Sequence, residues 1–257
     1  MTRDQTPLLE LMDITRRFGA IEALRGVSFP VRRGEVVALL GDNGAGKSTL
    51  VKIIAGGLEA TSGRMMFEGV ERAFASPAAA KAAGIETVYQ DLSLCTNVDV
   101  VANFFMGREI TKRVFGVPVL DERAMEAACA KAISDAGTKI PSLRINVEHL
   151  SGGQRQAIEL NRFVHWGGKL VLLDEPFAAL GVEQTRRGLD MIKRVAAQGI
   201  GVIIITHVMA QAFQVADRLV VIRQGVVAGD VACNATSPEE IIRMITGDAQ
   251  LGRKMGA

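Results

Sequence analysis

A glycine-rich segment followed by a lysine and a serine is the first place where the residue types suggest chemistry. Residues 41–49 read GDNGAGKST and match the phosphate-loop pattern G-x-x-x-x-G-K-(S/T). Its three glycines permit positive φ angles, so successive backbone N–H groups can point into one concavity. Residues 36–40 before it read as a buried strand, and residues 48–55 have helical spacing. A helix N-terminus would therefore add its partial positive charge to the loop.

The loop predicts a binding site for nucleotide phosphates. Lys47 would reach the β- and γ-phosphates, and the hydroxyl of Ser48 would ligate Mg²⁺. The predicted nucleotide-binding residues of this segment are Gly41, Asp42, Asn43, Gly44, Ala45, Gly46, Lys47, Ser48 and Thr49.

Two adjacent carboxylates follow a second apolar run, residues 170–173. Asp174 and Glu175 would lie at the C-terminal edge of a buried strand, which is where α/β sheets bind ligands. Asp174 would hold the Mg²⁺ shell, and Glu175 would act as general base on the attacking water. By itself, the Asp-Glu-Pro segment could also be a strand that ends at a turn; the phosphate loop upstream favours the catalytic interpretation.

Residues 150–154 read LSGGQ and directly precede a predicted helix. Ser151 and two glycines offer a hydroxyl, exposed N–H groups and a helix dipole, which together could form a second anion site. An N-capped helix with a flexible lead-in explains the same residues, and both roles can coexist. The predicted binding residues here are Ser151, Gly152, Gly153 and Gln154.

Together these segments resemble the ATP-binding subunits of ATP-binding-cassette (ABC) transporters, along residues 8–247. The resemblance implies ATP and Mg²⁺ as ligands and ATP hydrolysis as the activity. In that family the LSGGQ segment closes over the γ-phosphate held by the opposite subunit. It therefore implies a head-to-tail homodimer with two ATP molecules between the subunits, attached to a separate multi-span permease.

Three further positions match the family pattern. Gln90 resembles the glutamine that senses Mg²⁺ and water. The predicted metal-binding residues are therefore Ser48, Asp174 and Gln90, and Gln90 is also a predicted catalytic residue beside Glu175. His207 resembles the switch histidine that contacts the γ-phosphate, and Phe18 resembles the aromatic residue that stacks on adenine. Each has an ordinary alternative: a turn residue for Gln90, a helix cap for His207 and an apolar core residue for Phe18.

Several segments of the sequence resemble one group within the family. Residues 84–94, 97–103 and 106–109 resemble the monosaccharide importers of the ribose, xylose and fructose type. So does Gly181, which stands where most members carry an aspartate that reaches across the dimer. The resemblance implies an extracytoplasmic sugar-binding protein as a further partner. A second copy of this chain would replace the second cassette that such importers commonly carry.

Composition and charge fit this interpretation. The net charge of +2 over 257 residues gives no indication of nucleic acid as a partner. The three cysteines, Cys95, Cys129 and Cys233, lack metal-ligand spacing and suit a reducing compartment. No apolar run approaches the roughly 18 residues of a membrane span, and the first ten residues lack a signal-peptide core. We therefore expect a soluble subunit at the cytoplasmic face of the inner membrane, held there by the permease.

The expected fold is an α/β phosphate-loop ATPase core with a parallel sheet, an N-terminal antiparallel β subdomain and an inserted α-helical subdomain. Residues 1–257 would form one ATP-binding domain. Residues 1–90 and 157–247 make the core with the β subdomain, about 91–156 the helical subdomain, and 248–257 a tail. Within the insertion we expect helices over 97–107, 121–137 and 152–165, with a helical pattern throughout 92–165.

The predicted function is ATP hydrolysis that powers import of a monosaccharide. The alternatives are the ATPase subunit of an ABC exporter and a non-transport ABC-type ATPase. The groove between the core and the insertion, lined by residues 91–97 and 103–108, would dock a short permease helix. The side chains of Phe104 and Phe105 would either line that groove or pack inside the helical subdomain.

Overall fold

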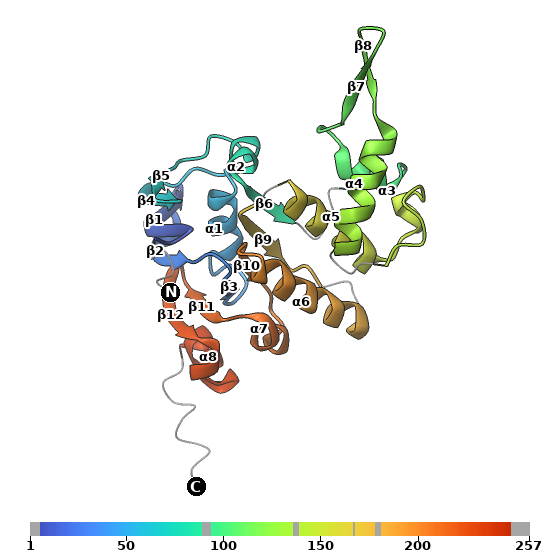
Figure 1. Cartoon of the computed structure of the whole chain (residues 1–257). Coiled ribbons are helices and arrows are strands. Elements are labelled where there is room, and N and C mark those ends of the chain that lie inside the picture. Colours follow the sequence, from blue (N-terminus) through green and yellow to red (C-terminus); the bar gives the residue numbers. More distant parts are fainter. Residues whose placement is uncertain (1–5, 89–93, 136–138, 167, 178–180, 248–257) are drawn as a thin grey trace.

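The computed structural model describes residues 6–88, 94–135, 139–166, 168–177 and 181–247 (Figure 1). A six-stranded sheet forms the centre of the chain, in the order β12-β11-β3-β10-β9-β6. Neighbouring strands run parallel except for β12, which pairs antiparallel with β11. Its strands are β3 (Val36–Leu40), β6 (Ile85–Val88), β9 (Leu170–Asp174), β10 (Gly201–Ile205), β11 (Arg218–Arg223) and β12 (Val226–Ala232).

Hydrophobic cores cover both faces of this sheet, which explains why its strands read as continuous apolar runs rather than alternating ones. In β3, Val37 and Leu39 pack with helix α1 (Lys47–Ile54) on one face. Val36, Ala38 and Leu40 pack on the other face with helices α6 (Val182–Ala197), α7 (Met209–Val215) and α8 (Pro238–Thr246).

A second, antiparallel sheet of four strands covers α1, as the sequence predicted for the N-terminal part. Its order is β2-β1-β4-β5, with β1 (Leu9–Phe18), β2 (Ile21–Val31), β4 (Ser62–Phe67) and β5 (Val70–Glu71). Helix α2 (Pro77–Ala83) follows, with Ser76 as N-cap and Pro77 in the first turn. Short 3₁₀ turns occur at η1 (Val147–His149) and η2 (Cys233–Ala235).

Helices α3 (Val100–Phe105), α4 (Glu122–Asp135) and α5 (Gly152–His165) surround a third, separate core. Figure 1 shows these helices beside the sheet, at the edge where β6 lies. Phe104 and Phe105 are fully buried here, so they pack inside the helical region. Among the described residues, no helix has both the length and the hydrophobicity needed to cross a lipid bilayer.

The expectation of a helical pattern throughout 92–165 is wrong between α3 and α4. There the chain forms an antiparallel hairpin of β7 (Thr111–Val114) and β8 (Val117–Leu120), which projects from the helices (Figure 1). Phe115 and Gly116 turn the chain with positive φ angles of 48° and 82°. Two successive positive φ angles are typical of the backbone of a two-residue hairpin turn, and the short runs with β-branched residues beside them form strands in spite of their helical spacing. Strand β12 and helix α8 were not predicted.

One buried amide fixes the entry to the helical region. The Oδ1 atom of Asn103 accepts a hydrogen bond from the Cys95 N–H at 2.7 Å. Its Nδ2 atom donates to the carbonyls of Cys95, Val98 and Asp99, at 2.9, 3.2 and 3.0 Å. Asn103 is fully buried, and removing its amide would leave the Cys95 N–H without an acceptor and take one of two donors from each of the three carbonyls.

We expect Asn103→Ala to lower the free energy of unfolding by about 2 kcal/mol, because it removes four hydrogen bonds at the start of α3 and leaves the Cys95 N–H without an acceptor. Denaturant unfolding of the purified chain measures this. The matched control is Asn97→Ala, since Asn97 is exposed; it should change stability by less than about 0.5 kcal/mol. Equal effects of the two substitutions would contradict the structural role of Asn103.

Candidate active site

The carboxyl ends of three neighbouring strands bring the predicted catalytic segments together. Strand β10 lies between β3 and β9, and Ile205 is in register with both Leu39 and Asp174. Because the three strands are parallel, the segments that follow them leave the same edge of the sheet. Those segments are the phosphate loop, Glu175 and His207. The predicted groups therefore converge at one place.

The phosphate loop is fixed in position by the strands around it. A Cβ atom on Gly41 would lie 2.1 Å from the carbonyl oxygen of Ile222, and one on Gly46 would lie 2.6 Å from that of Ala23. Both glycines also have left-handed φ angles, 145° and 112°. The Gly225 N–H donates to the Ala45 carbonyl at 3.0 Å. The loop is thus held by β2 and by the β11–β12 turn.

Lys47 begins α1 and turns its ammonium back over the loop. Its Nζ donates to the carbonyls of Gly41 and Asp42 at 2.6 and 2.8 Å. Burial lowers the pKa of Lys47, while the carboxylates of Glu175, Asp42 and Asp174 act in the opposite direction. A half-buried cation at a helix N-terminus is well placed to attract phosphate oxygens.

Asp174 and Glu175 lie side by side next to this cation. The pKa of Asp174 is raised, first by burial and then by the negative charge of Glu175, whereas Lys47 and Lys52 lower it. Glu175 has a left-handed φ of 48°, rare for a long side chain, and its N–H donates to the Ile205 carbonyl at 3.0 Å. Backbone strain of this kind clusters at functional sites.

His207 contacts one of the two carboxylates. Its Nδ1 lies 2.8 Å from Oε2 of Glu175, while the ring itself is exposed. The adjacent residue, Thr206, was not predicted to matter. Its buried hydroxyl donates to Oε1 of Gln211 at 2.9 Å and accepts from the Val208 N–H at 3.1 Å. These hydrogen bonds fix the backbone on either side of His207, and Thr206, directly before His207, was not among the predicted site residues.

The LSGGQ segment begins α5 with reciprocal hydrogen bonds. The Ser151 N–H donates to Oε1 of Gln154 at 3.0 Å, and the Gln154 N–H donates to the Ser151 hydroxyl at 3.3 Å. This is the capping-box pattern, so the alternative role as an N-cap is present in the structure. Within the described part of the chain, no hydrogen bond or ion pair joins Ser151 or Gln154 to the phosphate loop.

Phe18 lies at the end of β1 and is half exposed, with the guanidinium of Arg16 4.7 Å from the centre of its ring. It is therefore not an apolar core residue. Nearby, a hollow of about 380 Å³ connects the β1–β2 turn to the phosphate loop. Arg17, Ala20, Gly44 and Gly225 are among its lining residues. Gln90, predicted to sense Mg²⁺, lies outside the described residues.

The donor set fits Mg²⁺ better than a metal held by protein side chains alone. No group of three or more histidine, cysteine or acidic side chains in the described ranges could hold an ion. Mg²⁺ is commonly bound by one or two protein oxygens together with phosphate oxygens and water. The hydroxyl of Ser48, adjacent to Lys47 in α1, and the carboxylate of Asp174 would supply the protein oxygens.

Comparison with known proteins gives matches along nearly the whole chain. The family model described as ABC transporter matches residues 24–178. The xylose/arabinose import ATP-binding protein of Sulfolobus acidocaldarius is 43% identical over 96% of this chain and 98% of its own length. The fructose import ATP-binding protein of Rhizobium meliloti is 41% identical over 86% of both chains. The ribose import ATP-binding protein of Yersinia pestis is 36% identical over 95% of this chain but only 47% of its own length.

Solved structures give the same fold. The ADP conformation of an ATP-binding cassette of an ABC transporter superposes with a TM-score of 0.78 at 25% identity. The match covers 95% of this chain and 100% of that chain. The α/β class predicted from the sequence is thereby confirmed.

We expect Asp174→Asn to stabilise the fold at neutral pH. The raised pKa means that the folded chain disfavours the ionised carboxylate. Ionised Asp174 therefore lowers the free energy of unfolding above that pKa, and this destabilisation disappears as pH falls below it. Removing the charge should raise Tm by about 2 °C at neutral pH and by nothing in acid. Asp190→Asn, at an exposed site on α6, is the control. A lower Tm for Asp174→Asn at neutral pH would contradict this account.

Proposed function

The chain belongs to the ABC transporter family of ATP-binding proteins, and on this premise we propose that it hydrolyses ATP to drive import of a monosaccharide. For hydrolysis, the observation that supports the proposal most strongly is the Glu175 carboxylate, 2.8 Å from His207 and beside the phosphate loop. For the cargo, the support comes from relatives that import xylose or arabinose, fructose and ribose. These sugars differ in ring and carbon number, so the shared class is a monosaccharide.

We propose that ATP binds with its phosphates on the loop between β3 and α1. The backbone N–H groups of the loop, the ammonium of Lys47 and the α1 N-terminus would all favour their negative charge. Adenine would stack on Phe18, beside the hollow that leads to the loop. Ser48, Asp174 and Gln90 would hold Mg²⁺, which neutralises charge on the phosphates when bound.

Glu175 would act as general base in the hydrolytic step. A water oxygen attacks the γ-phosphorus in line, its proton passes to the Glu175 carboxylate, and the bond to the β-phosphate oxygen breaks to leave ADP and phosphate. His207 would orient the carboxylate through the 2.8 Å contact and present its other nitrogen toward the γ-phosphate. Most of the rate effect would come from fixed charges at the transition state.

A second copy of the chain would complete each site. In one chain the Ser151 end of α5 forms its hydrogen bonds with Gln154, and it presents its N-terminal dipole at an exposed position. Such a helix end favours an anion, and the γ-phosphate on the partner subunit's loop would supply one. The homodimer would then hold two ATP molecules, each shared between a phosphate loop and an LSGGQ segment.

Gly181 would leave one side-chain contact across this dimer unmade. It is the N-cap of α6 in an extended conformation, with φ −71° and ψ 167°. A Cβ atom there would meet the flexible Oε1 end of Gln184 at 2.7 Å, so the backbone does not require glycine. The aspartate common in the family would fit here and would be a better N-cap. The backbone therefore does not account for glycine at this position, and the missing aspartate should weaken coupling between the two sites.

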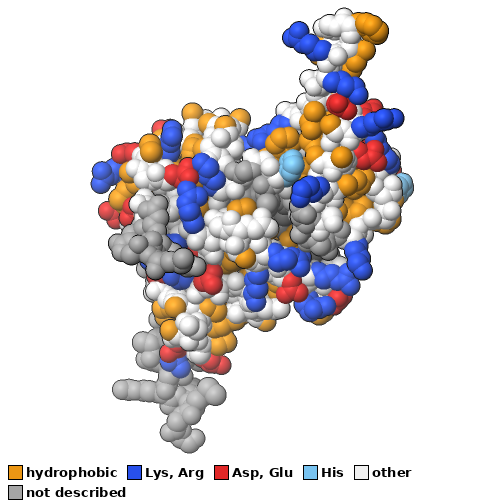
Figure 2. Space-filling view, in the orientation of Figure 1, with side chains coloured by type: hydrophobic (Ala, Val, Ile, Leu, Met, Phe, Trp, Pro, Cys, Tyr) orange, Lys and Arg blue, Asp and Glu red, His pale blue; other side chains and the backbone are white. Residues whose placement is uncertain are grey.

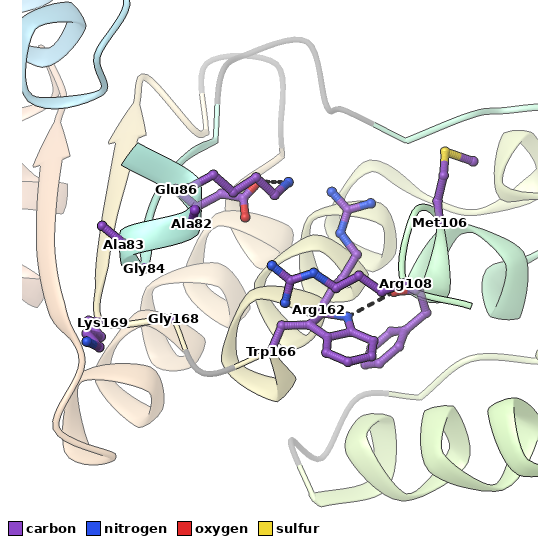
Figure 3. Close-up of a pocket in the computed structure, with 12 residues that line it drawn as sticks. Ala82, Ala83, Gly84, Glu86, Met106, Arg108, Arg162, Trp166, Gly168 and Lys169 are labelled. Carbon is purple, nitrogen blue, oxygen red and sulfur yellow. Dashed lines mark hydrogen bonds and ion pairs between the residues drawn. The ribbon is translucent and has the colours of Figure 1, made fainter. Parts of the chain in front are cut away.

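A membrane permease would dock in a groove of about 430 Å³ between the core and the helical region (Figure 3). The end of α2 and the start of β6 form one wall, and the ends of α3 and α5 form the other. Met106 is exposed at the rim, and Arg108 lies 5.1 Å from the Trp166 ring. A groove that combines an exposed apolar side chain with basic side chains suits a short amphipathic helix. The subunit would thereby sit at the cytoplasmic face of the inner membrane, below an extracytoplasmic sugar-binding protein.

A photo-crosslinking amino acid in place of Met106 or Arg108 should link to a cytoplasmic helix of the permease, because both side chains lie at the groove. The same amino acid in place of Ile242, exposed on α8, is the control and should not. Mass spectrometry of the assembled transporter identifies the product. An active transporter with no crosslink at either groove position would contradict this docking site.

We expect Glu175→Gln to bind ATP but to lower the hydrolysis rate on the order of a hundredfold or more, because the amide cannot take the proton. The closed dimer should then accumulate with ATP and Mg²⁺, as measured by size-exclusion chromatography with light scattering. Glu122→Gln, an exposed carboxylate on α4, is the control and should turn over like the parent. Hydrolysis by Glu175→Gln at the parent rate, or a persistent monomer with saturating ATP, would count against the mechanism.

A further inference from the structure

The β7–β8 hairpin exposes an apolar surface with no role in the site described above. All eight strand residues are exposed, and Phe115 at the tip is fully so. Figure 2 shows the hairpin projecting from the rest of the molecule, with hydrophobic and basic side chains next to each other. Its exposed hydrophobic residues are Val114, Phe115, Val117, Val119 and Leu120. An exposed two-stranded hairpin gains little stability of its own in water, so these side chains are not explained by folding.

The residues alternate between the two faces of the hairpin. Val114 pairs with Val117 and Lys112 pairs with Val119, so three valines gather on one face next to Phe115. The tip residue is itself unexpected, because Phe115 has a left-handed φ of 48°, where asparagine or glycine is usual. A bulky aromatic ring held at this strained position without burial is free to contact something outside the chain.

The charge of the hairpin identifies the kind of surface it fits. Residues 111–120 contain two basic residues, Lys112 and Arg113, and no acidic one. Lys112 contacts Asp121 at the base at 3.3 Å, whereas Arg113 takes part in no ion pair within the described residues. The shape is a convex protrusion, and its strands offer few side-chain groups for directional hydrogen bonds. An apolar tip beside cations suits an anionic lipid surface, where acyl chains take the ring and headgroups take the charge.

We propose that the β7–β8 hairpin inserts Phe115 and its neighbouring valines into the surface of an anionic membrane. The hairpin leaves the helical region next to α3, whose end lines the groove proposed for the permease (Figure 1, Figure 3). With the permease in that groove, the hairpin would face the membrane, and this orientation rests on the proposed function. Lipid contact would hold the helical region against the bilayer independently of the permease.

The full chain is tested by flotation with vesicles of phosphatidylglycerol and phosphatidylcholine in equal parts, in parallel with vesicles of phosphatidylcholine alone. We expect binding to the anionic vesicles only. Phe115→Asp should weaken it on the order of tenfold or more, because the substitution removes the apolar anchor and adds a repelled charge. Val117→Asp should act in the same direction. Val70→Asp, at an exposed site on β5, is the matched control and should bind like the parent.

Absence of binding to anionic vesicles, or binding that Phe115→Asp leaves unchanged, would overturn the proposal. A crosslink from position 115 to the permease in a reconstituted transporter, without vesicle binding by the free chain, would assign the hairpin to a protein partner and also overturn it. ATP hydrolysis by the same variants is the independent readout. A failure of lipid binding with normal turnover would leave the proposed function intact.

Discussion

The attraction between Lys47 and the two adjacent carboxylates, Asp174 and Glu175, is the interaction on which the site depends. Lys47 is half-buried, and the neighbouring carboxylates offset part of the cost of removing its charge from water. Burial, and then repulsion by the Glu175 carboxylate, raises the pKa of Asp174. A bound cation would stabilise the two carboxylates, and anionic phosphates would stabilise the lysine. The electrostatic cost of these charges in the free chain therefore favours binding of nucleotide with Mg²⁺.

The fold holds these charges at one edge of the central sheet. Parallel register between β3, β10 and β9 brings three chain segments together, and the hydrophobic cores on both faces keep that register fixed. The strands of the second sheet and the turn at Gly225 then close around the phosphate loop from outside. The LSGGQ helix end belongs to a different core, around α3, α4 and α5. The proposed dimer would bring this helix end of one chain to the phosphate loop of the other.

Local patterns predicted most of this arrangement, and the reasons for the failures are physical. The phosphate loop and the buried strands β3 and β9 were predicted because the loop motif and the continuous apolar runs are local features of the sequence. The β7–β8 hairpin was missed because its turn is Phe115-Gly116 rather than a usual asparagine-glycine pair. The contact of His207 with Glu175, the support from Thr206 and Gln211, and the left-handed φ of Glu175 depend on tertiary register, which spacing along the sequence does not carry.

The central claim is that each hydrolytic site is shared between two copies of the chain, and mixed dimers test it directly. One subunit carries Lys47→Ala and keeps its LSGGQ segment, while the other carries Ser151→Arg and keeps its phosphate loop. Each variant alone has no complete site, but the mixture contains one loop of parent sequence facing one parent LSGGQ segment. The account predicts that ATPase activity, absent from either variant, returns when the two are mixed, toward half that of the parent at most per mixed dimer. If the mixture stays as inactive as its components while mixed dimers form, the site is not shared in this way.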